Sequence, residues 1–293
     1  MNARDLTLSL SGHWHGSYGV TPCPVCQPDA RRDQSALTLS DSDDGRLLAH
    51  CKKSACTFTA ILSAAGVTTG DYRPPDPATL AQRDAERRKE GQKRADQARR
   101  CWEETEPIEG TPAENYLRGR GITCPLPPSL RYHPGCWHGP TAKRFPAMVA
   151  RIDGGDTFAI HRTYLHRDNT ALTDSRKMML GRARGGAVRL SDGHFRLAVA
   201  EGIETALSLS CGLLKGPATV WATLSTSGMR VLTLPKRKGR LTIAPDGDEA
   251  GRSAAHALAE RAHALGWKVD LLIPPEGYDW NDVVQENVRH DCA

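Results

Sequence analysis

Four cysteines near the start of the chain constrain its fold more than any other feature. Cys23-Pro-Val-Cys26 is followed, after residues 27–50, by Cys51-Lys-Lys-Ser-Ala-Cys56. Four thiolates suit the tetrahedral coordination of Zn²⁺, and the short spacing within each pair lets one turn present two sulfurs. The spacing therefore predicts one structural zinc ion bound by Cys23, Cys26, Cys51 and Cys56.

The residues between the two cysteine pairs predict how this part folds. Residues 36–39 and 46–49 have the composition of two short strands, and an Asp/Gly turn lies between them. Two strands carrying paired cysteines are the plan of a zinc ribbon. A segment of this size with so few aliphatic residues needs such a staple to fold.

Three histidines could replace one of the zinc ligands, and five more cysteines have to be assigned. His13, His15 and His50 are spare ligands, and His50 is the best substitute for Cys51, but ligation by cysteine alone is the favoured interpretation. The remaining cysteines have no paired spacing and are expected to be ordinary thiols: Cys101, Cys124, Cys136, Cys211 and Cys292. The odd total of nine cysteines argues against a disulfide framework.

Composition and length exclude several classes of protein. The 293 residues are 39% hydrophobic and 25% charged, as in soluble globular proteins. No apolar run approaches the ~20 residues that span a bilayer, and the first residues lack a signal-peptide pattern. We therefore expect a cytoplasmic protein with no membrane partner. The net charge of +5 permits a nucleic-acid partner without requiring one.

Changes in composition predict four parts along the chain. Residues 1–70 form the ribbon, a nucleic-acid-binding domain in which cations alternate with aromatic residues. Residues 71–106 begin with a proline-rich break and continue as a helix of mixed charge over 78–104, expected to be an exposed linker. Residues 107–192 form a basic α+β subdomain, and residues 193–293 form an α/β domain.

Local signals outline the two C-terminal parts. Thr111 and Glu114 have the spacing of a capping box, which predicts a helix over Ala113–Arg120 ended by Gly121. Residues 148–152 and 157–163 are expected to pair as antiparallel strands. After Gly193, expected strands at 195–200, 218–224, 241–244 and 269–273 alternate with helices at 203–214, 250–265 and 280–286. This alternation predicts a mostly parallel sheet with helices on both faces.

Acidic residues follow two of these strands. Glu201 follows the strand at 195–200, and Asp246 and Asp248 follow the strand at 241–244. Function in such sheets gathers at the carboxyl ends of the strands, so the three carboxylates should lie together. Crowded carboxylates are costly unless a cation lies between them, and oxygen ligands favour one or two Mg²⁺ or Mn²⁺ ions. Asp279 and Asp282 could join this site, or could instead cap the last helix.

The motifs around these acids carry a family resemblance. Residues 196–286, with the segments VAEGIETALSL, IAPDGDEAGR and DWNDVV, resemble the Toprim domain of phage- and plasmid-type DNA primases. The cysteine ribbon resembles their N-terminal zinc-binding domain, and residues 112–190 resemble the segment before Toprim. The resemblance implies an α/β protein built from a zinc ribbon, a charged linker helix, a basic α+β subdomain and a catalytic Toprim domain.

The resemblance also implies roles for individual residues. Glu201 matches the family's motif glutamate, and Asp246 and Asp248 match its aspartate pair. Thr205 stands where replicative primases usually have an aspartate, with Glu204 just before it. The nucleotide- or template-binding residues implied are Arg162, Arg176, Lys177, Arg182 and Arg184; the alternative for the segment 176–189 is a solvated turn of arginines and glycines.

The implied activity is that of a DNA primase, which makes short RNA primers on a single-stranded DNA template from ribonucleoside triphosphates. Glu201 would either hold metal or act as a general acid or base. No phosphate-binding loop of the Gly-x-x-x-x-Gly-Lys-Ser/Thr type occurs, so a replicative helicase would be a separate partner. Two other functions remain open: a Toprim-type metal-dependent nuclease, and a non-catalytic replication accessory that binds single-stranded DNA.

Overall fold

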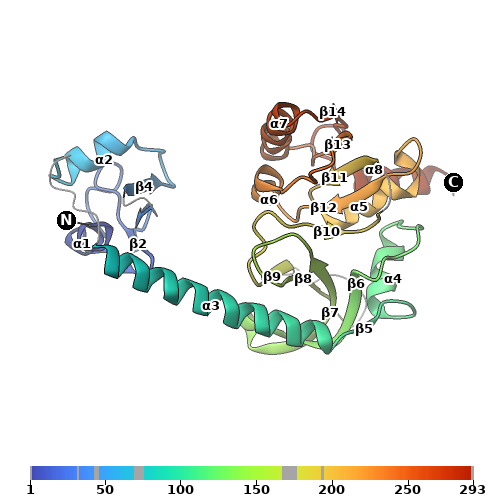
Figure 1. Cartoon of the computed structure of the whole chain (residues 1–293), viewed down its shortest axis with the longest axis horizontal. Coiled ribbons are helices and arrows are strands. Elements are labelled where there is room, and N and C mark those ends of the chain that lie inside the picture. Colours follow the sequence, from blue (N-terminus) through green and yellow to red (C-terminus); the bar gives the residue numbers. More distant parts are fainter. Residues whose placement is uncertain are drawn as a thin grey trace. The chain divides into compact units, whose positions relative to one another are not determined.

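The chain folds into two compact units, Met1–Glu90 and Gly91–Ala293. The structure, a computed structural model, describes residues 2–31, 33–42, 46–68, 76–166, 177–192 and 195–291. The long helix α3 (Pro77–Glu103) begins in the first unit and ends in the second (Figure 1). The finer four-part division stays a prediction. None of the helices in the described ranges is both long enough and apolar enough to cross a bilayer.

The first unit is built on an antiparallel sheet. Its strands are β1 (His13–Trp14), β2 (Tyr18–Thr21), β3 (Leu37–Asp41) and β4 (Leu47–Cys51), paired in chain order. The two ribbon strands expected from the sequence are β3 and β4. Because side chains alternate along a strand, Leu37 and Leu39 point into the core, where they pack with residues of α1 (Ala3–Ser9) and α2 (Phe58–Ala64).

Helix α3 is present where the sequence predicts it, but it is not exposed along its whole length. Within the first unit, the Arg83 guanidinium pairs with the Asp41 carboxylate at 2.7 Å and lies over the Trp14 ring at 5.5 Å. Within the second unit, Ala98 is buried and Arg99 lies over the Phe158 ring at 4.7 Å. Each end of the helix is therefore packed into the unit to which it belongs.

An antiparallel sheet forms the first half of the second unit. Its order is β5 (Glu106–Pro107), β6 (Leu130–His138), β7 (Lys143–Ile152), β8 (Ala159–Tyr164) and β9 (Lys177–Leu180). Met148 lies opposite Thr163, which confirms the antiparallel pair expected there. The short 3₁₀ helix η1 (Gly139–Thr141) connects β6 to β7.

The helix α4 (Pro112–Gly119) follows β5 and ends before Gly121, which has a positive φ of 75°. The capping box expected at its start is wrong in detail. The Thr111 hydroxyl donates to the Ile108 carbonyl at 2.6 Å, so it does not cap the helix. The Glu114 carboxylate instead accepts from the Gly110 N–H at 2.7 Å.

A second sheet forms the rest of this unit, in the order β10 (Val188–Arg189), β12 (Thr219–Ala222), β11 (Arg196–Ala200), β13 (Arg240–Ala244) and β14 (Lys268–Leu271). All neighbours are parallel except β10, which is antiparallel at the edge. The expected mostly parallel sheet is therefore confirmed.

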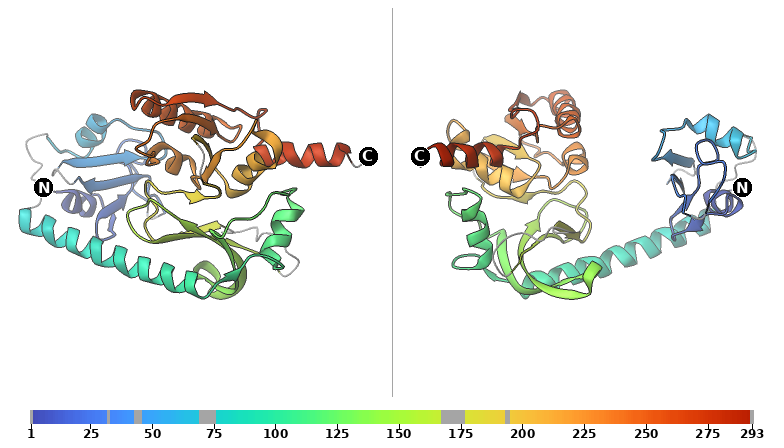
Figure 2. Two further views of the ribbon diagram at one scale, coloured as in Figure 1. Left: turned by 45° about the vertical axis from the view of Figure 1, so that its right-hand side comes forward. Right: turned by 180° about the vertical axis from the view of Figure 1, so that it is seen from behind.

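Helices cover both faces of this sheet (Figures 1 and 2). Helices α6 (Thr226–Val231) and α7 (Glu249–Ala264) pack on one face, where Met229 and Leu258 meet Val199 and Ile243. On the other face, α5 (Ile203–Ser208) packs beside α8 (Trp280–Asp291). The single helix expected at 203–214 is wrong at its end, because a π-helical turn η2 (Leu209–Leu213) follows α5 and Gly212 adopts φ 108°.

The two sheets of the second unit share one hydrophobic core. It contains Met148 and Leu165 from the antiparallel sheet region, Leu117 from α4, and Ala200 and Leu207 from the parallel-sheet domain. Burial of this shared apolar surface holds the antiparallel sheet against the parallel sheet. Residues of α4 and β9 are thereby brought next to residues that follow β11.

Candidate active site and metal sites

The acidic residues lie where two neighbouring strands end. Strands β11 and β13 are parallel and adjacent, with Ala200 opposite Ala244. Glu201 comes directly after β11, and Asp246 follows β13 after a proline. Asp248 begins α7 and accepts the Gly251 N–H at 2.6 Å, so one of its oxygens caps that helix. The carboxylates of Asp246 and Asp248 act electrostatically on Glu201, as expected for a shared site.

A close backbone contact fixes the loop that carries Asp246. The Gly247 N–H donates to the Tyr278 carbonyl at 2.8 Å, and Gly277 N–H donates to the Gly247 carbonyl at 3.2 Å. A Cβ atom at Gly247 would lie 2.6 Å from the Tyr278 carbonyl oxygen, so only glycine fits there. This contact holds the segment around Asp279 beside the Asp246 loop.

Asp279 and Asp282 combine the two roles that the sequence left open. Asp279 Oδ1 accepts from the N–H groups of Asn281 at 2.7 Å and Asp282 at 2.9 Å, and Asp282 Oδ2 accepts from the Asp279 N–H at 3.1 Å. They therefore form a capping arrangement at the start of α8. Their charges nevertheless raise the pKa of Asp246, so both lie at the border of the acidic cluster.

Two oxygens of the cluster are buried without a hydrogen-bond partner. Across the described residues, no donor contacts Glu201 Oε2 or Asp246 Oδ1. Burial, together with the charges of Asp246 and Asp248, raises the pKa of Glu201 to about 7. Burial and the charges of Asp279 and Asp248 raise the pKa of Asp246 to about 6. Buried carboxylate oxygens without donors fit a divalent cation with oxygen ligands.

These shifts predict how stability depends on pH when no magnesium is bound. The folded state holds these protons more tightly than the unfolded state between about pH 4 and pH 7, so its free energy of unfolding falls as pH rises through that window. We expect Glu201→Gln to match the wild type at pH 5 and to be more stable than it at pH 8, by on the order of 2 kcal/mol. Mg²⁺ should remove this difference at pH 8 by stabilising the wild type.

Denaturant unfolding of both proteins at the two pH values, with and without Mg²⁺, measures this difference. Equal stability of the wild type and Glu201→Gln at pH 8 without Mg²⁺ would show that the charge on Glu201 does not destabilise the folded state. The exposed Glu249, in the first turn of α7, provides the control, since Glu249→Gln should leave the pH dependence unchanged.

An ion pair with a buried carboxylate borders the acidic cluster. Lys177, on β9, contacts Glu204 Oε2 at 2.9 Å, and the Tyr116 hydroxyl donates to Glu204 Oε1 at 2.7 Å. Although burial opposes ionisation, the Lys177 charge and these hydrogen bonds lower the pKa of Glu204 to about 2. Lys177 also lowers the pKa of Asp246. The Lys177 charge therefore acts on the acidic cluster.

Loss of Lys177 should destabilise the second unit. Lys177→Met leaves the buried Glu204 carboxylate without its cation, and we expect a loss of up to about 3 kcal/mol, since part of Lys177 stays exposed to water. The pair's contribution is fully present above pH 4.5 and is lost as pH falls through the folded pKa near 2. Urea unfolding at pH 7 measures the loss, and the exposed Lys143 gives a control, since Lys143→Met should change stability by less than about 0.5 kcal/mol. Equal effects of the two substitutions would contradict the ion pair's importance.

The other predicted basic residues lie elsewhere. Arg162 is buried on the opposite face of β8 from His161 and donates to the Trp137 carbonyl at 3.3 Å. Arg182 and Arg184 are exposed after β9. Arg176 lies outside the described residues. Of the predicted basic residues, Lys177 thus lies beside the acidic cluster, and Arg162 is buried near Trp137.

Sequence reasoning missed His161 and the role of Glu204. His161 is buried, and its Nδ1 has no hydrogen-bond partner among the described residues. Burial and the Lys177 charge lower its pKa to about 4, so it is neutral at pH 7. One feature of the sequence could have indicated the role of Glu204: it is a charged residue on the apolar face of the helix that follows Glu201.

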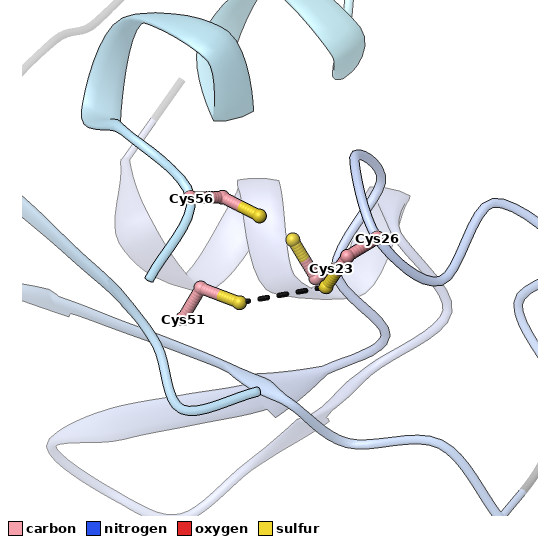
Figure 3. A group of neighbouring side chains, drawn as sticks. All are labelled: Cys23, Cys26, Cys51 and Cys56. Carbon is pink, nitrogen blue, oxygen red and sulfur yellow. Dashed lines mark hydrogen bonds between the residues drawn. The ribbon is translucent and has the colours of Figure 1, made fainter. Parts of the chain in front are cut away.

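The four predicted zinc ligands form one cluster in the first unit (Figure 3). The sulfurs of Cys23, Cys26, Cys51 and Cys56 all lie within 4.8 Å of one another, and Cys26 Sγ is 3.5 Å from Cys51 Sγ. That separation is too long for a disulfide bond. It suits sulfurs around one tetrahedral ion.

The surrounding backbone supports a thiolate at Cys51, whereas burial and the neighbouring sulfurs raise the pKa of Cys23 and of Cys56. Although burial raises it, hydrogen bonds from the backbone of Ser54, Cys56 and Lys53 lower the pKa of Cys51 to about 6. The side-chain oxygen Oε1 of Gln27 accepts from the Cys23 N–H at 3.2 Å and the Ala36 N–H at 3.0 Å, which ties the first cysteine turn to the start of β3. The donor set therefore fits a structural metal, and the spare histidines are not part of it.

Four of the remaining cysteines, whose spacing showed no pairing, lie in two neighbouring pairs. Cys101 Sγ lies 3.7 Å from Cys136 Sγ. Cys211 Sγ accepts from the Cys124 N–H at 3.5 Å, so these two cysteines are also neighbours. Sequence spacing could not show either pair, because tertiary packing brings the partners together. Cys292 lies outside the described residues.

Comparison with protein families agrees with this architecture. Residues 196–289 match the Toprim domain family, and residues 92–190 match a domain of unknown function, DUF7146. The C-terminal part of the chain is therefore a Toprim domain, and the identification made from its acidic motifs is confirmed. No curated protein sequence matches the chain.

Solved structures similar to the chain include bacterial and phage primases. The zinc-binding and RNA polymerase domains of Aquifex aeolicus primase are 14% identical, with a TM-score of 0.40 over 100% of this chain and 81% of that one. The RNA polymerase domain of Mycobacterium tuberculosis primase is 16% identical, with a TM-score of 0.37 over 67% and 80% of the two chains. The primase fragment of bacteriophage T7 primase-helicase is 17% identical, with a TM-score of 0.31 over 50% and 65%.

Proposed function

We propose that this protein is a DNA primase that joins ribonucleoside triphosphates on a single-stranded DNA template. The observation that carries the proposal is the acidic cluster of a Toprim domain, in which Glu201 Oε2 and Asp246 Oδ1 are buried without hydrogen-bond donors. A divalent cation bound between such oxygens would take them as ligands. Phosphoryl transfer from a nucleoside triphosphate is the chemistry that such a cation assists.

The residues of the site have separate roles in this proposal. Glu201, Asp246 and Asp248 would hold Mg²⁺ or Mn²⁺, an ion that would acidify the attacking 3′-hydroxyl and neutralise charge on the leaving pyrophosphate. The backbone contact at Gly247 keeps the Asp246 carboxylate at the end of β13. Asp279 and Asp282 keep the border of the site negative, which strengthens its attraction for cations.

The basic residues and the ribbon would bind nucleic acid. Lys177 is paired with Glu204, so in this proposal its main role is to order the site. Its charge would attract phosphate only weakly, because the Glu204 carboxylate neutralises most of it. Arg182 and Arg184 are exposed beside glycines, where backbone and guanidinium groups can approach phosphates. The zinc ribbon would contact the template strand, with an affinity that falls as salt rises. A separate replicative helicase is the partner expected for such an enzyme.

A combined polymerisation and cleavage assay tests the proposal. The full chain is incubated with labelled ribonucleotides and end-labelled single-stranded DNA, with and without Mg²⁺ or Mn²⁺. A primase gives metal-dependent RNA products several nucleotides long and leaves the DNA intact. No polymer under any condition, with tight DNA binding, would instead identify a non-catalytic accessory protein.

The same assay separates the nuclease alternative. A Toprim nuclease would use the same carboxylates with water as the nucleophile, so it would shorten the labelled DNA without consuming ribonucleotides. We favour polymerisation because the chain combines the acidic cluster with a cysteine cluster that fits a metal-stapled ribbon. Cleavage without polymerisation would overturn the primase proposal and keep the metal site.

A further inference from the structure

A second group of metal-type ligands lies in the second unit, outside the acidic site. Cys101 comes from the last turns of α3, and His133 and Cys136 come from β6. One sulfur or nitrogen atom from each lies within 4.8 Å of the others. His133 and Cys136 are buried, and Cys101 is half-buried. None of these residues takes part in the proposed phosphoryl transfer.

A bulge in β6 assembles this group. Residues three apart on a regular strand point to opposite faces of the sheet. The pairing of β6 with β7 shifts register between His133 and Cys136, where Pro134 and Gly135 lie. A one-residue bulge reverses the alternation beyond it, so His133 and Cys136 lie on the same face. Both then face the side on which Cys101 packs with Ala147, Val149 and Tyr164.

The spacing of the two sulfurs matches a shared metal ion. Cys101 Sγ and Cys136 Sγ are 3.7 Å apart. Two sulfurs at Zn–S distances of about 2.3 Å in tetrahedral geometry lie about 3.8 Å apart. A disulfide bond would need about 2.05 Å. The observed separation therefore suits two thiolates on one ion without movement of the backbone.

One ring nitrogen of His133 has the support that a metal-binding histidine requires. The Gly135 N–H donates to His133 Nδ1 at 3.1 Å, so Nδ1 carries a lone pair, which would exchange this hydrogen bond for the metal ion. The proton of the neutral ring is then on Nε2, which lies 3.2 Å from Glu104 Oε2. A carboxylate that accepts from the second nitrogen is the usual support for a metal-binding histidine.

We propose that Cys101, His133 and Cys136 bind a second metal ion, a soft divalent cation of the zinc class. Two thiolates and one imidazole are ligands typical of zinc, and Glu104 positions the imidazole. The group borders a cavity of about 530 Å³ that is also lined by Arg100, Arg144 and Arg162. A water molecule or an anion in this cavity would complete the coordination. This arrangement distinguishes the site from the cysteine cluster of the ribbon, which supplies four protein ligands.

Metal content of the full chain tests this proposal. After purification with a thiol reductant and without chelators, we expect two zinc ions per wild-type chain, one per Cys101→Ser chain and one per Cys136→Ser chain. Cys124→Ser is the matched control, since Cys124 neighbours Cys211 without a histidine, and it should keep two. One zinc per wild-type chain, or two in Cys101→Ser, would overturn the proposal and leave these cysteines as packed thiols.

A second measurement covers the case in which Cys101→Ser does not fold. A chain with Cys23→Ser and Cys26→Ser lacks the ribbon site and keeps the second unit. On addition of Co²⁺ we expect it to show sulfur-to-cobalt charge transfer from two thiolates, lost when Cys136→Ser is added. Absence of this absorption in the ribbon variant would also overturn the proposal.

Discussion

Replacing Asp246 and Asp248 together by asparagine should reduce metal-dependent nucleotide incorporation by at least about a thousandfold. The substitution removes two of the three carboxylates that would hold the cation, and such a cation contributes several kcal/mol to stabilising the transition state. Asparagine is preferable to alanine because its Oδ1 can still accept the Gly251 N–H that caps α7. Incorporation of labelled ribonucleotides on single-stranded DNA measures the effect.

Two controls separate loss of chemistry from loss of structure. The variant should unfold at nearly the same urea concentration as the wild type, since the cap and the backbone contacts at Gly247 remain. Glu249→Gln, which removes an exposed charge beside Asp248, should keep its activity within about twofold. A double variant that still incorporates nucleotides at the wild-type rate would remove the acidic cluster from the mechanism.

Replacing Cys23 and Cys26 together by serine should unfold the first unit. Its core is small, with residues such as Leu37, Leu39 and Ile61, and structural zinc sites contribute about 10–16 kcal/mol to folding in zinc-finger peptides. We expect the variant to lose one zinc ion per chain. Limited proteolysis should then cut within residues 1–68 and spare the folded part of residues 91–291.

The Toprim activity need not vanish in this ribbon variant. Template binding should weaken, and the remaining binding should depend less steeply on salt, because the phosphate contacts proposed for the ribbon would be lost. Cys124→Ser again serves as the control, with its zinc content and protease pattern unchanged. If the cysteine variant keeps its zinc content and resists protease, the assignment of these four ligands is wrong.

The sequence predicted well the features that depend on local patterns. The strands around Ala200 and Ala244 and the helix after Asp248 were predicted because apolar runs, alanine-rich helical spacing and glycines mark them. The convergence of Glu201 with Asp246 and Asp248 was predicted because the carboxyl ends of adjacent parallel strands share one edge. The geometry of the four cysteines followed in the same way from their spacing.

Features that depend on tertiary packing could not be predicted in this way. Lys177 and Glu204 meet only because the two sheets share a core, and no sequence spacing connects β9 with α5. Arg162 was predicted to bind nucleotide or template because of its motif. It is buried, and because side chains alternate along β8, it lies on the opposite face of the sheet from His161. The pairing of Cys101 with Cys136 requires both the end of α3 and the bulge in β6.

The proposed primase activity requires a divalent cation bound between carboxylates that come from separate strands. Electron paramagnetic resonance of Mn²⁺ added to the full chain measures this binding directly. We predict that the wild type removes Mn²⁺ from the free signal at pH 8, that Mg²⁺ releases it, and that Glu201→Gln with Asp246→Asn abolishes the binding while Glu249→Gln does not. Equal Mn²⁺ binding by the wild type and by the Glu201/Asp246 variant would contradict the account.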